Sequence, residues 1–202
     1  MPLRLAVLVS GEGTTLAHLV DRWRTEGAPP VEIVLVVADR PGIAAIARAR
    51  ERGLPVAVLP RRPAPERDAW AAELSQRLRE ARAELVVLAG FLSILPPQLV
   101  EEWRGRAINL HPSLLPRYGG RGMHGRKVHE AVLAAREPET GVTVHLVTGD
   151  VDGGPPLEIR RLPIEPGETP ETLRERLAPL ERDALDRTIR RFASGELALP
   201  YR

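Results

Sequence analysis

A chain of 202 residues that is 43% hydrophobic and 28% charged can bury one sizeable core. Its 29 basic and 27 acidic side chains are interspersed, which argues against a nucleic-acid stripe, and the lack of cysteine excludes disulfides, a thiol nucleophile and zinc–thiolate sites. The longest nearly apolar run, residues 85–95, is too short to cross a bilayer and no signal-peptide pattern is present, so we expect a cytoplasmic protein without membrane or nucleic-acid partners.

The first half of the chain alternates apolar strands with helices. In chain order we predict a strand at 3–10, a helix at 14–27, a strand at 31–39, a helix at 42–53, a strand at 54–60, a helix at 66–81, a strand at 83–90, a short helix at 96–103 and a strand at 106–110. This alternation is typical of βαβ units, which build a parallel sheet covered on both faces.

The pattern changes in the second half. Residues 141–149 and 156–164 flank the sequence DVDGG and indicate an antiparallel strand pair. A terminal helix is predicted at 169–195, interrupted at Pro179. Without a linker or repeat, we expect one α/β domain over residues 1–202, with a Rossmann-like, open, mostly parallel sheet, helices on both faces and the antiparallel pair near the C-terminus.

The sequence SGEGTT, residues 10–15, joins the first strand to the first helix. Ligands bind beyond the carboxyl ends of parallel strands, and free N–H groups at a helix N-terminus attract anions. No lysine follows, so this is not a P-loop. A plain turn with Thr14 or Thr15 capping the helix explains the residues equally well. A dinucleotide site with Asp39 on the ribose is less favoured, because Leu16 replaces the third glycine.

The sequence INLHPSLLP, residues 108–116, directly follows a predicted buried strand. Asn109, the only asparagine, lies two residues before His111, so both side chains point to one face of the strand. An amide beside an imidazole can polarise a carbonyl and move a proton. The remaining histidines are expected to be structural (His18 and His145) or at the surface (His124 and His129). Their spacing in the sequence is not that of a metal site.

A carboxylate from DVDGGPP, residues 150–156, could complete this constellation. A nearby carboxylate raises the pKa of an imidazole and orients the ring. Asp150 and Asp152 are both candidates by this reasoning, and turn formation would also explain both.

Almost the whole chain resembles the phosphoribosylglycinamide formyltransferases, folate-dependent enzymes of purine synthesis, from LAVLVSGEGTTL to TIRRFASGEL. INLHPSLLP and VDGGPP are typical of the folate formyltransferase superfamily, and the SGxGT opening favours the glycinamide branch. The resemblance implies formyl transfer from 10-formyltetrahydrofolate to the amine of 5′-phosphoribosylglycinamide. We expect small-molecule substrates only, no metal, and a monomer or homodimer.

The resemblance also implies roles for individual residues. Asn109, His111 and Asp152 match the catalytic trio, with Asn109 as donor to the oxyanion and His111 kept cationic by Asp152. The implied substrate-binding residues are Gly13, Thr14, Thr15 and Glu181 for the ribonucleotide, and Arg67, Leu92, Ser93, Ile94, Leu95 and Asn109 for the folate. The phosphate site would thus lie mainly in residues 1–90, and the folate and catalytic sites in residues 91–202.

Some positions depart from the family pattern. Glu12 and Thr15 stand where many relatives have asparagine, and Ser93 replaces a common arginine. An acid beside a phosphate loop is unfavourable unless it points away. His129 lies in RGMHGRKVHEAV, residues 121–132, which is longer than the short form of this loop, and is expected to replace a loop histidine.

Three other functions stay open. Methionyl-tRNA formyltransferases share the donor and trio but normally carry a C-terminal tRNA-binding domain, for which we expect no room. Binding of tRNA nevertheless stays an alternative, because the chain has a basic cluster near the predicted site that consists of Arg117, Arg121, Arg126 and Lys127. Formyltetrahydrofolate hydrolases usually have a regulatory domain before the formyltransferase domain. This alternative is less favoured, because the first strand of the predicted sheet here begins at residue 3. A non-catalytic nucleotide-binding module would leave Asn109 and His111 unexplained.

Overall fold

The computed structural model describes residues 1–63 and 65–201, which form one seven-stranded sheet in the order β3-β2-β1-β4-β5-β6-β7. The elements are β1 (Leu3–Val9), α1 (Thr14–Glu26), β2 (Val31–Ala38), α2 (Ala44–Glu51), β3 (Val56–Val58), α3 (Arg67–Glu80), β4 (Leu85–Leu88), α4 (Pro97–Glu102), β5 (Ala107–His111), α5 (Arg126–Ala134), β6 (Glu139–Leu146), β7 (Pro156–Pro163) and α6 (Pro170–Ala193). The first five strands of this order, β3-β2-β1-β4-β5, are parallel to one another. Strand β6 pairs with β5 in antiparallel fashion, and β7 pairs with β6 in the same way. The predicted fold class is confirmed.

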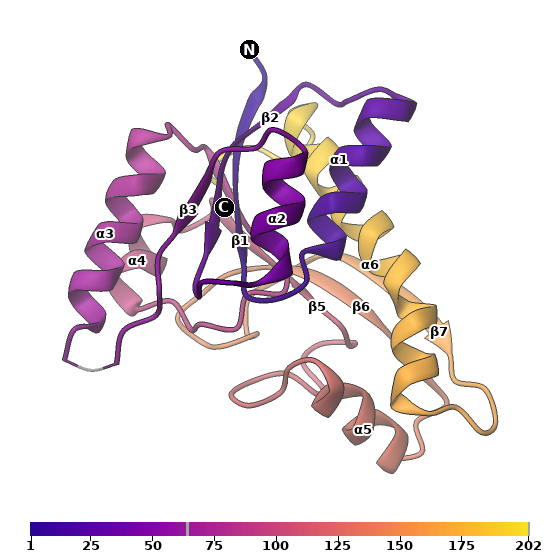
Figure 1. Cartoon of the computed structure of the whole chain (residues 1–202). Coiled ribbons are helices and arrows are strands. Elements are labelled where there is room, and N and C mark those ends of the chain that lie inside the picture. Colours follow the sequence, from indigo (N-terminus) through magenta and orange to yellow (C-terminus); the bar gives the residue numbers. More distant parts are fainter. Residues whose placement is uncertain (64, 202) are drawn as a thin grey trace.

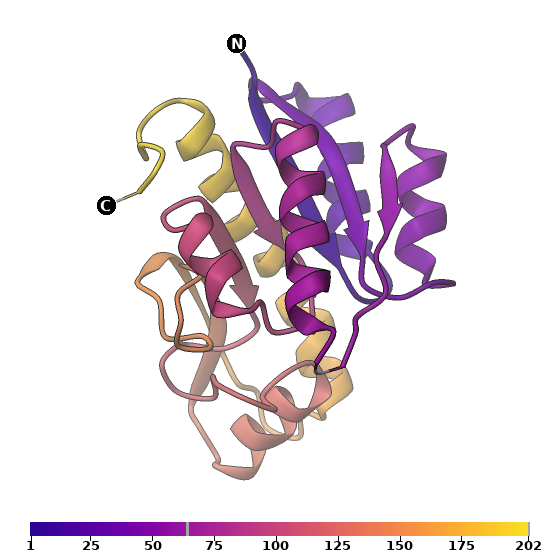
Figure 2. The ribbon, with the colours of Figure 1, turned by 90° about the vertical axis from the view of Figure 1, so that its left-hand side faces the viewer.

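Helices cover both faces of the sheet (Figures 1 and 2). In β1, Leu5, Val7 and Val9 enter a core with α1, α2 and α6. Ala6 and Leu8 point the opposite way, into a second core with α3 and α4. This alternation follows from the two-residue repeat of a strand, and it explains why the buried part of β1, residues 5–9, is apolar on both faces.

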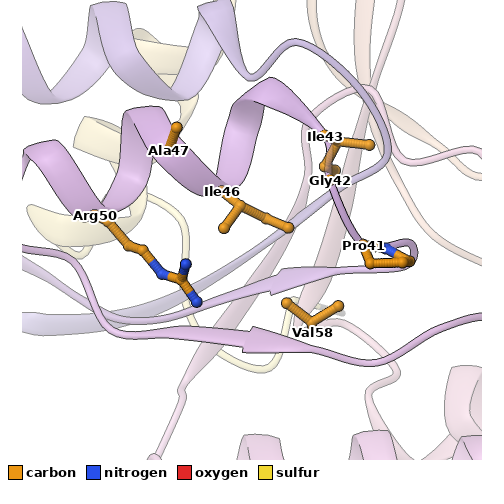
Figure 3. A pocket seen from close by; sticks show the side chains of 7 residues that line it. All are labelled: Pro41, Gly42, Ile43, Ile46, Ala47, Arg50 and Val58. Carbon is orange, nitrogen blue, oxygen red and sulfur yellow. The ribbon is translucent and has the colours of Figure 1, made fainter.

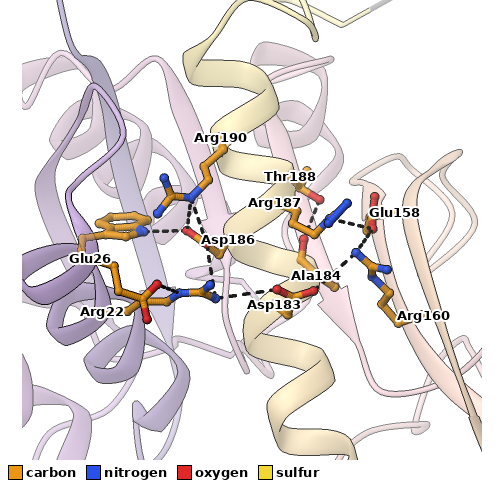
Figure 4. Close-up of polar contacts among 11 residues, drawn as sticks. Arg22, Glu26, Glu158, Arg160, Asp183, Ala184, Asp186, Arg187, Thr188 and Arg190 are labelled. Carbon is orange, nitrogen blue, oxygen red and sulfur yellow. Dashed lines mark hydrogen bonds and ion pairs between the residues drawn. The ribbon is translucent and has the colours of Figure 1, made fainter.

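A buried polar cluster joins α1 to α6 (Figure 4). Asp186 is only 2% exposed and accepts a hydrogen bond of 2.6 Å from the indole nitrogen of Trp23. The Nε of Arg190 donates to both carboxylate oxygens, and Arg22 approaches within 3.5 Å. Buried charge is tolerated because it is paired and hydrogen-bonded. The cluster therefore holds two helices that both reach the functional site described below.

The helices differ from the sequence analysis in two places. Helix α5 was not predicted, because the glycines of residues 119–125 obscure the start of a nine-residue helix whose signal is the buried pair Val128 and Val132. Helix α6 runs through Pro179 without interruption. An interior proline costs about 3 kcal/mol. Here Pro179 is exposed, and buried leucines on both sides, among them Leu177 and Leu185, pack the helix onto the core and offset that cost.

Within the described part of the chain, no helix has both the length and the apolar character needed to cross a membrane.

Candidate active site

A cavity of about 720 Å³ opens at the carboxyl ends of β1, β4 and β5. Its lining comprises residues 11–15, 88–95, 109–112, 120–125 and 147–152, with Val100, His129, His145, and, from α6, Arg174, Glu175, Ala178, Glu181 and Arg182. We call it the main cavity. A smaller hollow of about 380 Å³ lies between α2 and β3, and its lining is mostly apolar with Arg50 as its single charged side chain (Figure 3). The grouped polar side chains of the main cavity make it the candidate site.

Strand β5 brings Asn109 and His111 to one side of the sheet, as the sequence predicts. In the register with β6, Asn109 lies opposite His145 and His111 opposite Thr143. Thus His145, expected to be structural, joins the candidate site. The signal that would have revealed this is the antiparallel register, which the sequence does not specify.

Both N–H groups of the Asn109 side-chain amide face hydrogen-bond partners. Its Nδ2 lies 3.1 Å from Nε2 of His145 and 3.3 Å from Oδ1 of Asp152. A carboxylate only accepts, so the nitrogen must face Asp152. Nδ1 of His145 donates to the carbonyl of Leu146 at 2.8 Å, which leaves Nε2 to accept from Asn109. The expected donation to an oxyanion therefore requires Asn109 to give up one bond, and the longer one to Asp152 is the weaker.

His111 is 4% exposed, and its two ring nitrogens face different partners. Its Nε2 donates to the carbonyl of Tyr118 at 2.9 Å, so this nitrogen carries a proton. Its Nδ1 faces Oδ2 of Asp152 at 3.6 Å. Nδ1 is the ring nitrogen left for proton exchange with a ligand.

The expectation that Asp152 keeps His111 cationic was wrong for the free protein. Burial lowers the pKa of His111 below its usual 6.5, and this outweighs the opposite effects of the Asp152 charge and the Tyr118 carbonyl. Neighbouring His145 lowers the pKa of His111 further. His111 is therefore mostly neutral near neutral pH, and its Nδ1 is a base.

Asp152, rather than Asp150, lies beside His111. Burial by itself would raise the pKa of Asp152, but its polar contacts together lower it. The Gly120 N–H donates to Oδ2 at 3.0 Å. Asp152 is ionised at neutral pH, whereas the exposed Asp150 shapes the turn through its backbone carbonyl, which accepts from Gly153.

The loop after β1 begins helix α1 at the cavity. Gly13 is the N-cap in a left-handed conformation, with φ of 67°, and no side chain caps the helix, which contradicts the alternative of a threonine cap. Thr14 and Thr15 form the first turn, whose N–H groups are available to an anion. The carboxylate of Glu12 pairs with Arg48 of α2 at 3.6 Å, which explains how an acid is tolerated here.

The segment Leu92–Leu95 forms an apolar wall of the cavity and is fixed at three points. Ser10 Oγ accepts from the Leu92 amide at 2.8 Å, and Ser93 Oγ donates to buried Asp39 at 2.7 Å. Arg67 donates to the Ile94 carbonyl at 2.8 Å. Ser93 and the leucines line the cavity, but Arg67 supports the segment from outside its lining. Asp39, engaged with Ser93, is not at the cavity, which argues against a dinucleotide ribose site.

Two further lining residues, His129 and Glu181, have shifted pKa values. His129 is 2% exposed, so its expected surface position was wrong, and its Nδ1 has no protein partner among the described residues. Burial lowers the pKa of His129, whereas exposed His124 lies on the glycine-rich loop. Glu181 of α6 is partly exposed to the cavity, yet desolvation raises its pKa to about 7. The cavity thus holds a carboxyl that is half protonated near neutrality.

The raised pKa of Glu181 predicts an unusual dependence of stability on pH. Between its ordinary value of 4.5 and about 7, the folded chain keeps a proton that the unfolded chain has lost. The free energy of unfolding should therefore fall as pH rises through this window, by on the order of 2 kcal/mol. Glu181→Gln should remove this contribution, and urea unfolding of both proteins at pH 5 and pH 8 measures it. Glu175→Gln, at an exposed glutamate of the same helix, should follow the wild type; an equal pH response in Glu181→Gln would contradict the prediction.

Comparisons with a protein-family model and with curated proteins both find relatives over nearly the whole chain. The family model described as formyl transferase matches residues 3–189. The chain is 42% identical to the trifunctional purine biosynthetic protein adenosine-3 of Drosophila pseudoobscura pseudoobscura over 96% of its own length and 14% of that protein. It is 31% identical to the phosphoribosylglycinamide formyltransferase of Haemophilus influenzae, over 97% of this chain and 90% of the relative.

Among solved structures, glycinamide ribonucleotide transformylase 1 from Symbiobacterium toebii superimposes with a TM-score of 0.89 at 34% identity, covering 98% of this chain and 91% of that one. The chain thus spans most of the length of the single-function relatives and about a seventh of the first trifunctional one.

Proposed function

Since the chain belongs to the formyl transferase family, we propose that it transfers a formyl group from 10-formyltetrahydrofolate to the amine of 5′-phosphoribosylglycinamide in purine biosynthesis. The family resemblance of the sequence motifs is confirmed. The observation that carries the proposal is the contact of Asn109, His111 and Asp152 at the base of a cavity that also reaches the N-terminus of α1.

The cavity fits two small substrates of this kind. Its volume of about 720 Å³ is in the usual range for ligand sites, roughly 300–1,000 Å³. The first turn of α1 offers backbone N–H groups to a phosphate, and Leu92–Leu95 offer an apolar surface to a flat ring system. In this proposal residues 1–90 hold the phosphate and residues 91–202 hold the folate and the reacting groups, with Glu181 contacting the ribonucleotide.

The reaction exchanges one carbon–nitrogen bond for another. The amine nitrogen attacks the formyl carbon, and an electron pair of the carbonyl moves onto oxygen to give a tetrahedral oxyanion. The pair then returns, the bond from carbon to the donor nitrogen breaks, and one proton passes from the attacking to the departing nitrogen. No covalent intermediate with the protein is required.

The side chains at the base of the cavity match these steps. Neutral His111 can take the amine proton on Nδ1 and pass it to the departing nitrogen, acting as base and then as acid. The ionised carboxylate of Asp152, 3.6 Å away, stabilises the intervening imidazolium. Asn109 can turn the N–H that now contacts Asp152 at 3.3 Å toward the oxyanion.

An acceptor assay distinguishes this function from its rivals. The protein is incubated with 10-formyltetrahydrofolate and, in separate reactions, with 5′-phosphoribosylglycinamide, with initiator methionyl-tRNA, or with water as the sole acceptor. We expect efficient formylation of the ribonucleotide only. Formylation of the tRNA alone would favour a methionyl-tRNA formyltransferase, release of formate alone a hydrolase, and no turnover a nucleotide-binding module; each result would overturn the proposal.

A further inference from the structure

Tyr118 adopts a conformation that its residue type disfavours. Its φ of 57° lies in the left-handed region, where a bulky side chain is strained. The two following residues, Gly119 and Gly120, are glycines, yet the position with this φ is occupied by tyrosine. A residue that adopts a disfavoured backbone conformation must be held there by its other contacts.

The side chain of Tyr118 provides such a contact. Its hydroxyl donates a hydrogen bond of 2.6 Å to Oε1 of Glu137, which lies between α5 and β6. The side chain of Glu137 is only 13% exposed, and it is also paired with Arg117, whose Nη1 donates at 3.1 Å. The Arg117 guanidinium in turn lies 5.6 Å from the centre of the Tyr118 ring. We call this arrangement the Tyr118–Glu137 contact.

The backbone around Tyr118 contacts the catalytic pair. Its carbonyl accepts the Nε2 proton of His111 at 2.9 Å, and two residues later the Gly120 amide donates to Asp152 at 3.0 Å. Gly119 passes so close that an added Cβ would lie 3.1 Å from Cβ of Asp152. A short segment therefore contacts the imidazole through a carbonyl and the carboxylate through an amide.

We propose that Tyr118 is a positioning residue: the Tyr118–Glu137 contact holds its carbonyl against His111, which keeps the imidazole proton on Nε2 and leaves Nδ1 for proton transfer. The inference rests on the proposed formyl transfer only for its kinetic consequence. Because a carbonyl cannot donate, a ring that rotates or changes tautomer loses this bond. Losing the hydroxyl would let the backbone relax from the left-handed region, and the carbonyl would move from His111.

Removing one oxygen atom tests this role. Tyr118→Phe should lower kcat about tenfold while the KM of each substrate changes less than about twofold, because binding surfaces are kept and only proton transfer is impaired. Glu137→Ala should give the same loss, and combining both changes should add little to it. Glu137→Gln, whose amide oxygen still accepts from the hydroxyl, should restore most of the activity. Tyr201→Phe, at the second of the two tyrosines, is the matched control.

Nitrogen-15 NMR of the His111 ring provides the measurement that does not depend on turnover. The wild type should show the proton on Nε2, and Tyr118→Phe should show a mixture of tautomers or an averaged signal. An unchanged ring signal in a variant that folds like the wild type would overturn the proposal, as would lower thermal stability with unaltered kcat. An inactive wild type that nevertheless shows the expected change in tautomer would instead contradict the proposed function alone.

Discussion

Asp152→Asn is expected to leave the protein folded and to remove most of the proposed formyl transfer activity, with kcat reduced ~100- to 1,000-fold. The asparagine keeps the shape of the side chain but removes the charge that stabilises the His111 imidazolium 3.6 Å away. It also replaces a carboxylate that accepts from both Asn109 and the Gly120 amide. Steady-state kinetics with both substrates, together with folate binding at equilibrium, measures the loss.

The cause of this loss can be tested separately. Without the Asp152 charge, the pKa of His111 should fall further below 6.5, because the charge now offsets part of the effect of burial. NMR titration of the ring in both proteins measures that shift. His111→Ala should also lose most of the activity, and the double variant should lose far less than the product of the single losses.

Asp150→Asn is the matched control, since Asp150 lies two residues earlier in the same turn and, although it lines the main cavity, its side chain is exposed. It should keep at least about half of the activity, because its backbone carbonyl, which accepts from Gly153, is unaltered. Equal losses in both aspartate variants, or an unchanged His111 pKa in Asp152→Asn, would contradict the assigned pairing.

Gly13→Val is expected to raise the KM of the ribonucleotide strongly and to destabilise the fold. Gly13 has φ of +67°, and a Cβ there would lie 2.7 Å from the Cβ of Ala45 at the start of α2. Helix α1 would have to shift relative to α2, which removes its first-turn N–H groups from the phosphate. The strain and overlap should together cost ~1–3 kcal/mol of stability, measurable by urea unfolding.

Gly42 separates strain from overlap. Its φ is +74°, but nothing lies within 4 Å of an added Cβ, and it does not line the main cavity. Gly42→Ala should therefore lower stability and leave the ribonucleotide KM unaltered. If Gly13→Val weakened folate binding in place of ribonucleotide binding, the two sites would have been assigned the wrong way round.

Most of the fold could be predicted from local patterns of the sequence. Residues 5–9 of β1, 33–38 of β2 and all of β4 are apolar without interruption because both faces of the sheet are covered there, and the helices between these strands bury one stripe each. The same reasoning placed Asn109 and His111 together, because two residues at alternate positions of one strand must share a face. These properties depend on neighbours in the chain, and a linear pattern records them.

Contacts between distant segments were decided by the tertiary structure. His145 meets Asn109 only through the register of β6 on β5, and buried His129 meets the cavity only through the packing of α5. The sign of the His111 pKa shift depended on the balance between burial and the charge of Asp152, and a motif contains no measure of burial. Residue types determine which chemistry is available, whereas desolvation and register arise from the whole packed chain and determine which protonation state and which partner each residue has.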